Sequence, residues 1–445
     1  MFNITQLIEI TNAKKLNDFK IDENKTFVVS TDTRTINKNN VYLPLVGEKF
    51  DGNSFIEDAI NNSEIEVYFT TNENYIFENA LGLYVNDTKE AYLKLAKYYK
   101  NKINPTTIAV TGSCGKTTVK EMLYNVLSQK YNVHKTKLNH NNEIGFAQTI
   151  FSLKPDNQIL IVEMGMRGLN EIDLICKYAN PNYSIITNVL TAHIGRLGSR
   201  ENIAKAKCEV THYMKEPKTA VVYNDPLILE NINDKSINVL TFDINTPNLK
   251  ILKHEESKSL FEYKNNLYEL NIEGIYNIQN SLAAIELGLL LNLTPEQIAK
   301  GLNEYKPIDM RWNVIKYNND KITIVNDCYN ANPDSMKAAI KTFFEIYKNQ
   351  KNILVLGDMS ELGDNEISYH KELGEYLNNF EYYALITVGS LAKNINITSK
   401  NKNKIHFDNI NECKGYIFDK IKEGNILIKA SRSMEFEKIT QGVTK

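Results

Sequence analysis

Long apolar runs are missing from this sequence of 445 residues, and a membrane-spanning helix needs roughly 18 to 20 such residues. The first residues, MFNITQLIEITNAKK, also lack the basic start and apolar stretch of a signal peptide. Only five cysteines occur, without a C-x-x-C pair, so we expect reduced thiols instead of disulfides. Together these deficits predict a cytoplasmic protein without membrane insertion.

An excess of charge of one sign is also missing. The formal net charge is −2, so no broad basic field predicts a nucleic-acid partner. No repeat of fixed period occurs, which argues against a solenoid. A chain of this length exceeds what one hydrophobic core usually supports, so we expect several domains.

The rhythm of apolar runs divides the chain into three parts. Residues 1–103 hold short apolar runs and a helical stretch, TKEAYLKLAKYYKNK, and Pro105 marks a break. Residues 104–312 alternate strand-like runs with amphipathic helices, which predicts a mainly parallel sheet with helices on both faces. Residues 313–445 repeat this rhythm. We therefore predict an α/β fold of three domains: a small N-terminal α/β domain, a central domain and a Rossmann-like C-terminal domain.

Three shorter stretches give local predictions. SLFEYKNNLYELNI predicts a hairpin, because asparagines separate two alternating runs. Thr294, Pro295 and Gln297 predict a helix start with a capping box and a first-turn proline. The polar ITSKNKNKIHF predicts a solvated loop.

The stretch TTIAVTGSCGKTTVKEMLYNVL resembles a phosphate-binding loop. Gly115, Lys116 and Thr117 match the end of the pattern G-x-x-x-x-G-K-[ST], but Val110 stands where the first glycine belongs. A strand candidate precedes the loop and a helix candidate follows it. In that setting Gly112 permits a tight turn, Lys116 supplies a charge and Thr117 a hydroxyl for Mg²⁺. The alternative is a glycine turn before an ordinary helix.

Polar side chains follow several other apolar runs. Glu163 ends ILIVE, at the carboxyl edge of a predicted sheet, where a carboxylate could hold Mg²⁺ or simply face water. His193 follows SIITNV by a few residues, although a lone histidine is more often structural. Lys207 lies within a helical stretch, where a solvated lysine is the ordinary case.

A cluster of polar residues follows the run KITIV. Asp327, Tyr329, Asn330 and Asn332 precede a helix that Pro333 opens, which favours a ligand site although a capped turn would have a similar sequence. The string LVLGDMSELGD repeats the arrangement with an aspartate, residue 358.

Taken together, these strings resemble the Mur ligases, the ATP-dependent amide-forming enzymes of bacterial cell-wall synthesis. The short loop TGSCGKTT is that family's form, which accounts for Val110. NDCYNANPDSM, LGDMSELG, TKLNHNNEIG, AHIGRLGSRENIAKAKCE and KASRSMEFE are most similar to the family members that join D-alanyl-D-alanine to UDP-N-acetylmuramoyl-tripeptide. STDTRTINKNNVYLPLVGEKFDGNSFIEDAI looks like the family's UDP-sugar-binding segment.

The resemblance implies ATP and Mg²⁺ as cofactors and assigns residues to both. The implied ATP-binding residues are Gly112, Ser113, Cys114, Gly115, Lys116, Thr117, Thr118, Asn280, Arg311 and Asp327. The implied metal-binding residues are Thr117, Glu163 and His193, and the implied catalytic residues are Lys116, Glu163, His193 and Lys207. Lys207 matches a lysine that is carbamylated in several family members.

Substrate positions are implied in the same way. Asp32, Thr33 and Arg34 would lie near the UDP-sugar. The remaining predicted substrate residues are Asn142, Asn330, Asn332, Asp358 and Ser431, the last four of them near the dipeptide. One residue departs from the family pattern: Tyr276 in GIYNIQN replaces a common histidine. We expect the chain to act as a monomer.

The implied chemistry proceeds through an acyl phosphate on the tripeptide, followed by attack of the dipeptide amine. An acyl phosphate must be kept from water, so we expect domain closure about hinges near residues 104 and 312. Three alternatives remain at this point. They are a folylpolyglutamate-type ligase, which would leave the UDP-sugar-like segment unexplained, a P-loop ATPase or switch protein, and an inactive scaffold.

Overall fold

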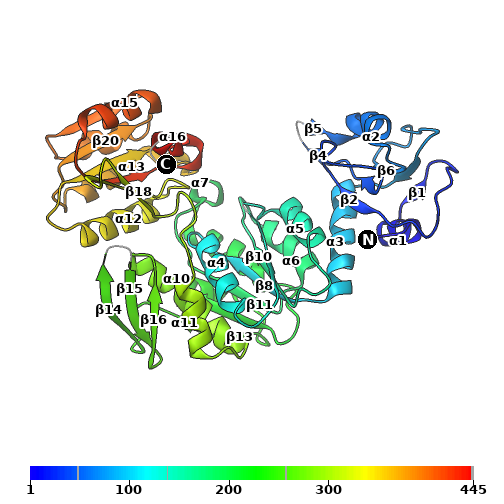
Figure 1. Cartoon of the computed structure of the whole chain (residues 1–445), viewed down its shortest axis with the longest axis horizontal. Coiled ribbons are helices and arrows are strands. Elements are labelled where there is room, and N and C mark those ends of the chain that lie inside the picture. Colours follow the sequence, from blue (N-terminus) through cyan, green and yellow to red (C-terminus); the bar gives the residue numbers. More distant parts are fainter. Residues whose placement is uncertain (48–49, 138, 256–257, 442–445) are drawn as a thin grey trace.

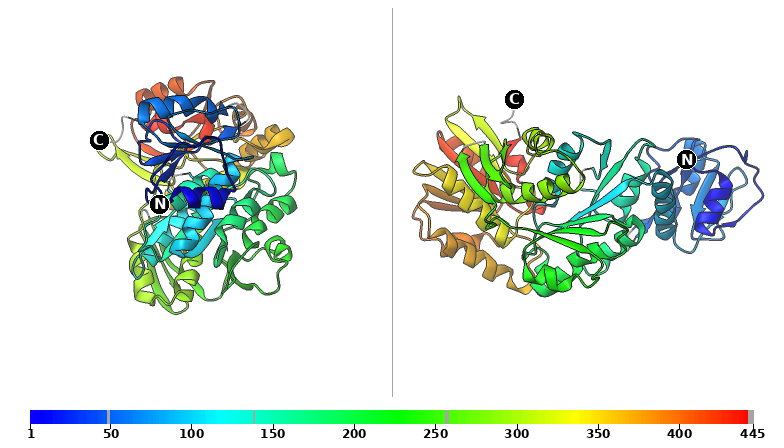
Figure 2. Two further views of the ribbon diagram at one scale, coloured as in Figure 1. Left: turned by 90° about the vertical axis from the view of Figure 1, so that its right-hand side faces the viewer. Right: turned by 90° about the horizontal axis from the view of Figure 1, so that it is seen from below.

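The computed structural model describes residues 1–445 except 48–49, 138, 256–257 and 442–445. Three main sheets follow one another along the chain. The N-terminal and C-terminal parts lie at opposite ends of an elongated molecule, with the central part between them (Figure 1, Figure 2). None of the helices in the described ranges combines the length and the apolar character that a membrane span requires.

The N-terminal part is a five-stranded sheet in the order β1-β7-β6-β3-β2, in which only β1 runs antiparallel to its neighbour. Its strands are β1 (Lys14–Lys15), β2 (Val28–Ser30), β3 (Asn40–Tyr42), β6 (Val67–Thr70) and β7 (Leu81–Tyr84), with a small hairpin of β4 (Val46–Gly47) and β5 (Phe50–Asp51). Its helices are α1 (Ile4–Thr11), α2 (Ile56–Ser63) and α3 (Thr88–Ile103).

The central part is a six-stranded sheet in the order β13-β12-β11-β8-β10-β9, and every pair in it is parallel. Its strands are β8 (Thr106–Thr111), β9 (Val133–Lys135), β10 (Ile159–Glu163), β11 (Tyr183–Ile186), β12 (Thr219–Tyr223) and β13 (Asn238–Phe242). Its helices are α4 (Lys116–Leu127), α5 (Glu143–Phe151), α6 (Glu171–Ala179), α7 (Ile194–Leu197), α8 (Arg200–Cys208), α9 (Pro226–Asn231), α10 (Ile275–Leu290) and α11 (Pro295–Asn303).

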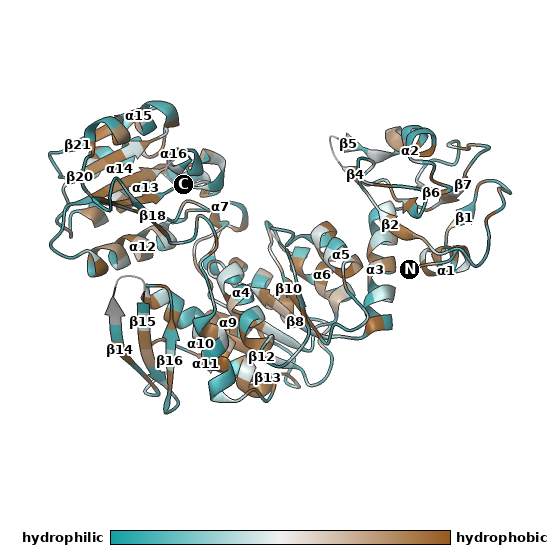
Figure 3. Ribbon diagram, viewed as in Figure 1, coloured by the Kyte–Doolittle hydropathy of each residue, from teal (hydrophilic) through white to brown (hydrophobic). Residues whose placement is uncertain are grey.

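Alternation along the central strands divides the core between two faces. Ile108 and Val110 of β8 pack with α4 and α10, whereas Ala109 of the same strand packs with α5, α6 and α8. Figure 3 shows β8 and β10 as apolar strands, as expected for a parallel sheet that is covered on both sides. Burying each of the larger aliphatic side chains contributes roughly 1.5–3 kcal/mol relative to exposure.

A smaller antiparallel sheet and two helices complete the central part. The sheet consists of β14 (Leu249–Glu255), β15 (Lys258–Tyr263) and β16 (Asn266–Leu270), so the predicted hairpin is confirmed as β15–β16. Thr294 caps α11: its hydroxyl accepts from the Gln297 backbone amide. The Gln297 side-chain oxygen in turn accepts from the Thr294 backbone amide. This capping box is also confirmed.

The C-terminal part is a second six-stranded sheet, in the order β17-β18-β22-β19-β20-β21. Only β17 and β18 are antiparallel, so the sheet has the Rossmann-like character that was predicted. Its strands are β17 (Asn313–Tyr317), β18 (Ile322–Asn326), β19 (Asn352–Gly357), β20 (Ala384–Val388), β21 (Lys404–Phe407) and β22 (Gly424–Lys429). Its helices are α12 (Pro333–Ile346), α13 (Glu366–Leu377), α14 (Lys393–Thr398), α15 (Ile410–Lys420) and α16 (Glu437–Thr440).

The α/β fold class is confirmed, and one local prediction is wrong. ITSKNKNKIHF is not simply a solvated loop, because its last four residues form the edge strand β21, paired with β20. An edge strand pairs on one side only, and all four side chains are half-buried, so the sequence shows no clear alternation. The domain boundaries at 103/104 and 312/313 stay a prediction, although α3 ends at Ile103 and β17 begins at Asn313.

Contacts tie the N-terminal part to the central one through α3. This helix packs on α5, where the rings of Tyr92 and Phe151 lie 5.1 Å apart. Tyr99 donates its hydroxyl hydrogen to the Leu153 carbonyl at 3.1 Å. The N-terminal sheet is therefore held beside the central sheet by one helix face.

Candidate active site

A cavity of about 1100 Å³ lies where the carboxyl ends of the central strands face the C-terminal sheet. Ligands of open α/β sheets bind at such edges. The predicted residues that line it are Ser113, Cys114, Gly115, Lys116, Thr117, Thr118, Asn142, Glu163, His193, Lys207, Asn280, Arg311, Asp327, Asn330 and Asn332. The structure therefore gathers most of the predicted site around one space.

The loop between β8 and α4 needs glycine at two places. Gly112 has a φ of +149°, and a Cβ there would meet the Thr187 hydroxyl at 1.8 Å. Gly115 has a φ of +81°, and a Cβ there would meet the Asn280 side chain at 2.5 Å. The backbone of a glycine loop before a helix N-terminus suits a phosphate group.

Lys116 begins α4 and folds back over the same loop. Its Nζ donates to the Gly112 carbonyl at 2.7 Å and lies 3.4 Å from the Ser113 carbonyl oxygen. Burial lowers the pKa of this lysine. One positive charge is thus held directly at the turn.

Glu163 ends β10 and faces the start of α4. Thr117 donates its hydroxyl hydrogen to Oε1 of Glu163 at 3.2 Å, and Asn141 donates to the same oxygen at 3.2 Å. Arg311 reaches across from the junction with the C-terminal part and donates to the Thr117 hydroxyl at 2.9 Å. The hydroxyl and the carboxylate predicted to hold a metal are therefore neighbours.

These two side chains have the chemistry of a magnesium site. Both Thr117 and Glu163 offer hard oxygen atoms, and Mg²⁺ is usually held by one or two such protein groups together with substrate phosphates. The described residues include no cluster of three or more His, Cys, Asp or Glu side chains that could hold a metal by themselves. The donor set fits a metal that is shared with a nucleotide.

His193 lies on the wall of the cavity but is engaged with the C-terminal part. Its Nδ1 lies 2.5 Å from Oε2 of Glu361. The histidine lowers the pKa of the Glu361 carboxyl. A metal-binding role for His193 stays a prediction, and it would have to use Nε2 while this contact persists.

Lys207 on α8 is buried, with 2% of its surface exposed, and lines the cavity. Burial lowers its pKa well below the ordinary lysine value, and the nearby Lys116 charge adds to this. No carboxylate of the described residues is among the groups that shift this pKa. A buried lysine of this kind favours the neutral amine.

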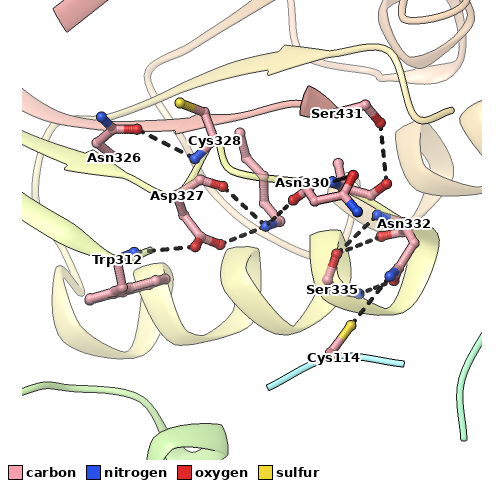
Figure 4. Close-up of polar contacts among 11 residues, drawn as sticks. Cys114, Trp312, Asn326, Asp327, Cys328, Asn330, Asn332, Ser335 and Ser431 are labelled. Atoms are coloured by element: carbon pink, nitrogen blue, oxygen red, sulfur yellow. Dashed lines mark hydrogen bonds and ion pairs between the residues drawn. The ribbon is translucent and has the colours of Figure 1, made fainter. Parts of the chain in front are cut away.

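The junction before β17 carries a second polar group. Asp327 accepts from the Trp312 backbone amide at 3.2 Å (Figure 4). It also pairs with Lys429 at 2.6 Å. The Arg311 guanidinium stacks on the Tyr329 ring at 4.0 Å. Trp312 has a φ of +55°, which is rare for a bulky residue and often marks a functional site.

Asn332 and Asn330 lie beside this group. Asn332 caps α12 through a capping box with Ser335, and its amide also donates to the Cys114 sulfur at 3.3 Å (Figure 4). The Asn330 side chain accepts from the Ala331 amide. The sequence left open whether this segment is a capped turn or a ligand site. The structure shows a capped turn that also lines the cavity.

Asn142 and Asn280 also combine structural and cavity-facing positions. Asn142 caps α5, accepting from the Gly145 amide at 2.8 Å. Asn280 lies on α10 against Gly115, the glycine of the phosphate loop. Their predicted roles toward substrate and nucleotide stay predictions.

Two of the four residues predicted to lie near the dipeptide are outside the lining of the cavity. The Ser431 hydroxyl accepts from the Ser360 amide at 2.8 Å. The Asp358 carboxylate accepts from the amides of Leu391 and Ala392 at 3.1 and 2.7 Å. In the structure both side chains hold loops of the C-terminal sheet.

The predicted UDP-sugar residues lie in the N-terminal part, away from the cavity lining. Arg34 donates twice to the Asp32 carboxylate, at 2.8 and 2.7 Å, and Thr33 lies between them in the loop after β2. The hydrogen bonds from Arg34 lower the pKa of Asp32 to about 2. The exposed guanidinium keeps donors available to a phosphate.

Tyr276, the departure from the family pattern, lines the cavity. Its ring meets the Trp312 ring edge-on with 5.9 Å between centroids. Its hydroxyl is buried without a hydrogen-bond partner among the described residues, and burial raises its pKa well above the ordinary value.

Four residues at the site were not singled out from the sequence. Lys429 could have been found, because a lysine at the end of the apolar run NILIK parallels Glu163 at the end of ILIVE. Asn141 stands beside the predicted Asn142. Lys120 and Glu361 gave no local signal, since their partners come from distant segments.

Two known family models match the central and the C-terminal parts of the chain separately. A model of the Mur ligase middle domain matches residues 110–288, and a model described as Mur ligase, glutamate ligase domain matches residues 310–432. The UDP-N-acetylmuramoyl-tripeptide–D-alanyl-D-alanine ligase of Bacillus subtilis (strain 168) is 35% identical over 449 residues, covering 99% of this chain and 97% of that protein.

Two solved structures are similar over almost the whole chain. A crystal structure of MurF from Acinetobacter baumannii superposes with a TM-score of 0.90 at 27% identity, covering 99% of this chain and 98% of that one. MurF ligase from Thermotoga maritima, solved in complex with ADP, gives a TM-score of 0.84 at 26% identity, covering 95% and 98%. The similarity therefore includes the N-terminal part, which the two domain models leave unmatched.

Proposed function

The chain belongs to the Mur ligase family, and from this premise we propose that it joins D-alanyl-D-alanine to UDP-N-acetylmuramoyl-tripeptide with ATP. It is an acid–amino-acid ligase whose product is the pentapeptide precursor of peptidoglycan. The observation that carries this function is the shared cavity, into which the phosphate loop, Glu163 and the Asp327–Lys429 pair all face. A near-full-length match to the Bacillus ligase supports the choice of substrates.

In the first step, a carboxylate oxygen of the tripeptide attacks the γ-phosphorus of ATP. The bond from that phosphorus to the bridging oxygen breaks, giving an acyl phosphate and ADP. Lys116 and the N-terminus of α4 both present positive charge at the phosphate loop, so we assign to them stabilisation of the transferred phosphoryl group.

We assign Thr117 and Glu163 to Mg²⁺, on the strength of their adjacent oxygen atoms. When bound, Mg²⁺ neutralises phosphate charge during the transfer. Arg311 positions the Thr117 hydroxyl and brings a further cation toward the nucleotide. Asp327 and Asn280 are assigned to the nucleotide because both line the same space.

In the second step, the dipeptide amine attacks the acyl carbon and inorganic phosphate leaves. A C–N bond forms, a C–O bond breaks and the amine loses a proton. We assign Asn330 and Asn332 to the dipeptide, because both line the cavity from the loop between β18 and α12. Asp358 and Ser431 act indirectly in this scheme, by holding the loops behind them.

We propose that Lys207 is carbamylated. Its lowered pKa favours the neutral amine, whose nitrogen attacks CO₂, forms a carbamate and releases a proton. The modification would place a negative charge near Lys116. Intact mass measured without acid should be higher by one CO₂ than the sequence mass, and a bare amine would refute this point.

The N-terminal part is proposed to hold the UDP-sugar through Asp32, Thr33 and Arg34. Because these residues lie away from the cavity, the reaction requires the tripeptide to reach across or the parts to close. Small-angle scattering that is identical with and without all ligands would argue against closure. A monomeric state and a cytoplasmic location stay predictions.

The decisive experiment measures phosphate release from ATP with each substrate added singly and together. Release only with both UDP-N-acetylmuramoyl-tripeptide and D-alanyl-D-alanine, with a pentapeptide product by mass, is the expected result. Release independent of both would favour an ATPase or switch protein. Release with a folate substrate and glutamate would favour a folylpolyglutamate-type ligase instead.

A further inference from the structure

Lys120 lies one turn beyond Lys116 on α4, and the reaction proposed above does not use it. It is one of the largest fully buried side chains of the described residues, with 1% of its surface exposed. Its Nζ is 3.3 Å from Oε2 of Glu163 and 3.4 Å from Oε1 of Glu121. A lysine is almost never so buried unless it is paired, and here both partners are carboxylates.

The two oxygens of Glu163 have different surroundings. Oε1 accepts from Thr117 and Asn141, on the side of the phosphate loop. Oε2 is buried, has no hydrogen-bond partner among the described residues, and faces the Lys120 ammonium. The carboxylate therefore presents one oxygen toward the nucleotide side and one toward an internal cation.

The pairing continues away from the cavity. Glu121 contacts the ammonium of Lys135, which also lies 3.8 Å from the centre of the Tyr124 ring. Lys135 and Glu121 are partly exposed, whereas Lys120 and Glu163 are not. Charges thus alternate from the surface to the site, and the four together carry no net charge.

We propose that Lys120 is the built-in counter-ion of Glu163, which makes divalent-metal binding at this carboxylate depend on the phosphates of a bound nucleotide. A buried carboxylate without a partner would attract a free cation. An ammonium already beside Oε2 neutralises it and repels a second cation. The negative phosphates of a nucleotide reverse that balance, so the metal binds with the nucleotide rather than before it.

The proposal rests on the nucleotide and metal site assigned above and names how that site is regulated. It differs from a purely structural role for Lys120 in the sign of one effect. A structural lysine, once removed, would loosen Glu163 and weaken metal binding. A counter-ion, once removed, leaves a carboxylate that binds free metal more tightly.

The test uses Mn²⁺ as the probe, because its paramagnetic resonance signal reports the free ion directly. The full-length protein is titrated with Mn²⁺ without nucleotide, as wild type and as Lys120→Met, a variant of similar length without charge. We expect Lys120→Met to bind one Mn²⁺ at least about tenfold more tightly than wild type. Equal or weaker binding would overturn the proposal.

Three variants serve as controls. Lys130→Met makes the same change at an exposed lysine, whose amine donates to the Asn292 carbonyl and lies over the Tyr131 ring, and should bind Mn²⁺ as wild type does. Lys120→Arg keeps the charge and should also match wild type. Adding Glu163→Gln to Lys120→Met should abolish the gained affinity, and persistence of that affinity would place the metal elsewhere and refute the proposal.

If Lys120→Met fails to fold, Lys120→Gln replaces it, because a neutral amide can still bond both carboxylates. Wild type alone gives an independent criterion. Its Mn²⁺ affinity should rise at least about tenfold when ADP is added, and no rise would also overturn the proposal. These titrations need no peptide substrate, so their outcome is separate from that of the phosphate-release assay.

Discussion

Asn332 donates its side-chain amide to the sulfur of Cys114 at 3.3 Å, so the first turn of α12 touches the phosphate loop. The contact joins the C-terminal sheet to the central sheet at the point where the nucleotide phosphates are proposed to bind. Cys114 is also the only one of the five cysteines that is not buried. Its thiol therefore reports on both the loop and the contact.

We expect a thiol reagent such as an aromatic disulfide to label one cysteine of the native protein rapidly, and ADP to slow that labelling. Burial raises the pKa of the Cys208 thiol to about 12 and shifts the other buried thiols in the same direction, so their reactive thiolate forms are scarce. Absorbance of the released thiol measures the rate. Cys114→Ser is the control and should remove the rapid phase, whereas two rapid equivalents would contradict the exposure pattern.

Lys429→Met should destabilise the protein by about 3 kcal/mol, because it leaves the Asp327 carboxylate without its buried partner. Denaturant unfolding measures the change. The matched control is Lys438→Met, which breaks an exposed pair with Glu435 and should have little effect. A double variant that also carries Asp327→Asn should recover part of the loss, and no recovery would mean that the pair is not the cause.

Lys207→Met should abolish or strongly reduce ligase activity and yet stabilise the fold by about 1–3 kcal/mol at neutral pH, when measured in CO₂-free buffer. The pKa of Lys207 is lowered in the folded state, so between that value and the unfolded value the unfolded chain binds the additional proton. Wild-type stability therefore rises with pH through this window. The gap between wild type and variant should shrink as the pH approaches the ordinary lysine pKa.

Thermal unfolding at several pH values, read beside the activity assay, checks this prediction. Lys205→Met serves as the control, because that lysine lies on the exposed face of the same helix. A gap between wild type and Lys207→Met that widens with rising pH would contradict the sign of the shift.

Arg34→Ala should raise the KM for UDP-N-acetylmuramoyl-tripeptide by about tenfold, with kcat and the KM for ATP little changed. The guanidinium is exposed and preoriented by Asp32, in the geometry that suits a phosphate oxygen. Steady-state kinetics with one substrate varied at a time measure this. Lys38→Ala, at another exposed cation of the same segment, should leave all three constants near wild type.

Much of the fold was predictable because its signals are local. The parallel central sheet follows from apolar runs that alternate with amphipathic helices, and the α11 start follows from Thr294 and Gln297. The pattern of SRENIAKAKCEVTHYM suggests one continuous helix, whereas α8 ends at Cys208 and a short 3₁₀ turn follows it. Helical periodicity predicts that a helix exists more reliably than where it ends.

The site was predictable where a polar residue ends an apolar run. Glu163 and Asp327 both stand at such positions, and both line the cavity. Lys120 was not predictable, since its position within α4 is that of an ordinary surface lysine until β10 is placed against it. Asp358 shows the converse: its position after a strand matches that of Asp327, yet its carboxylate binds loop amides.

Trp312 is the only tryptophan in the sequence, and it packs against Tyr276 at the junction between the central and C-terminal parts. Its indole is buried on the cavity wall, and its backbone amide is tied to Asp327. The protein therefore contains its own optical label at this junction. Emission excited selectively from tryptophan comes from this one position, so nucleotide arrival and relative movement of the two parts can be followed in unlabelled protein.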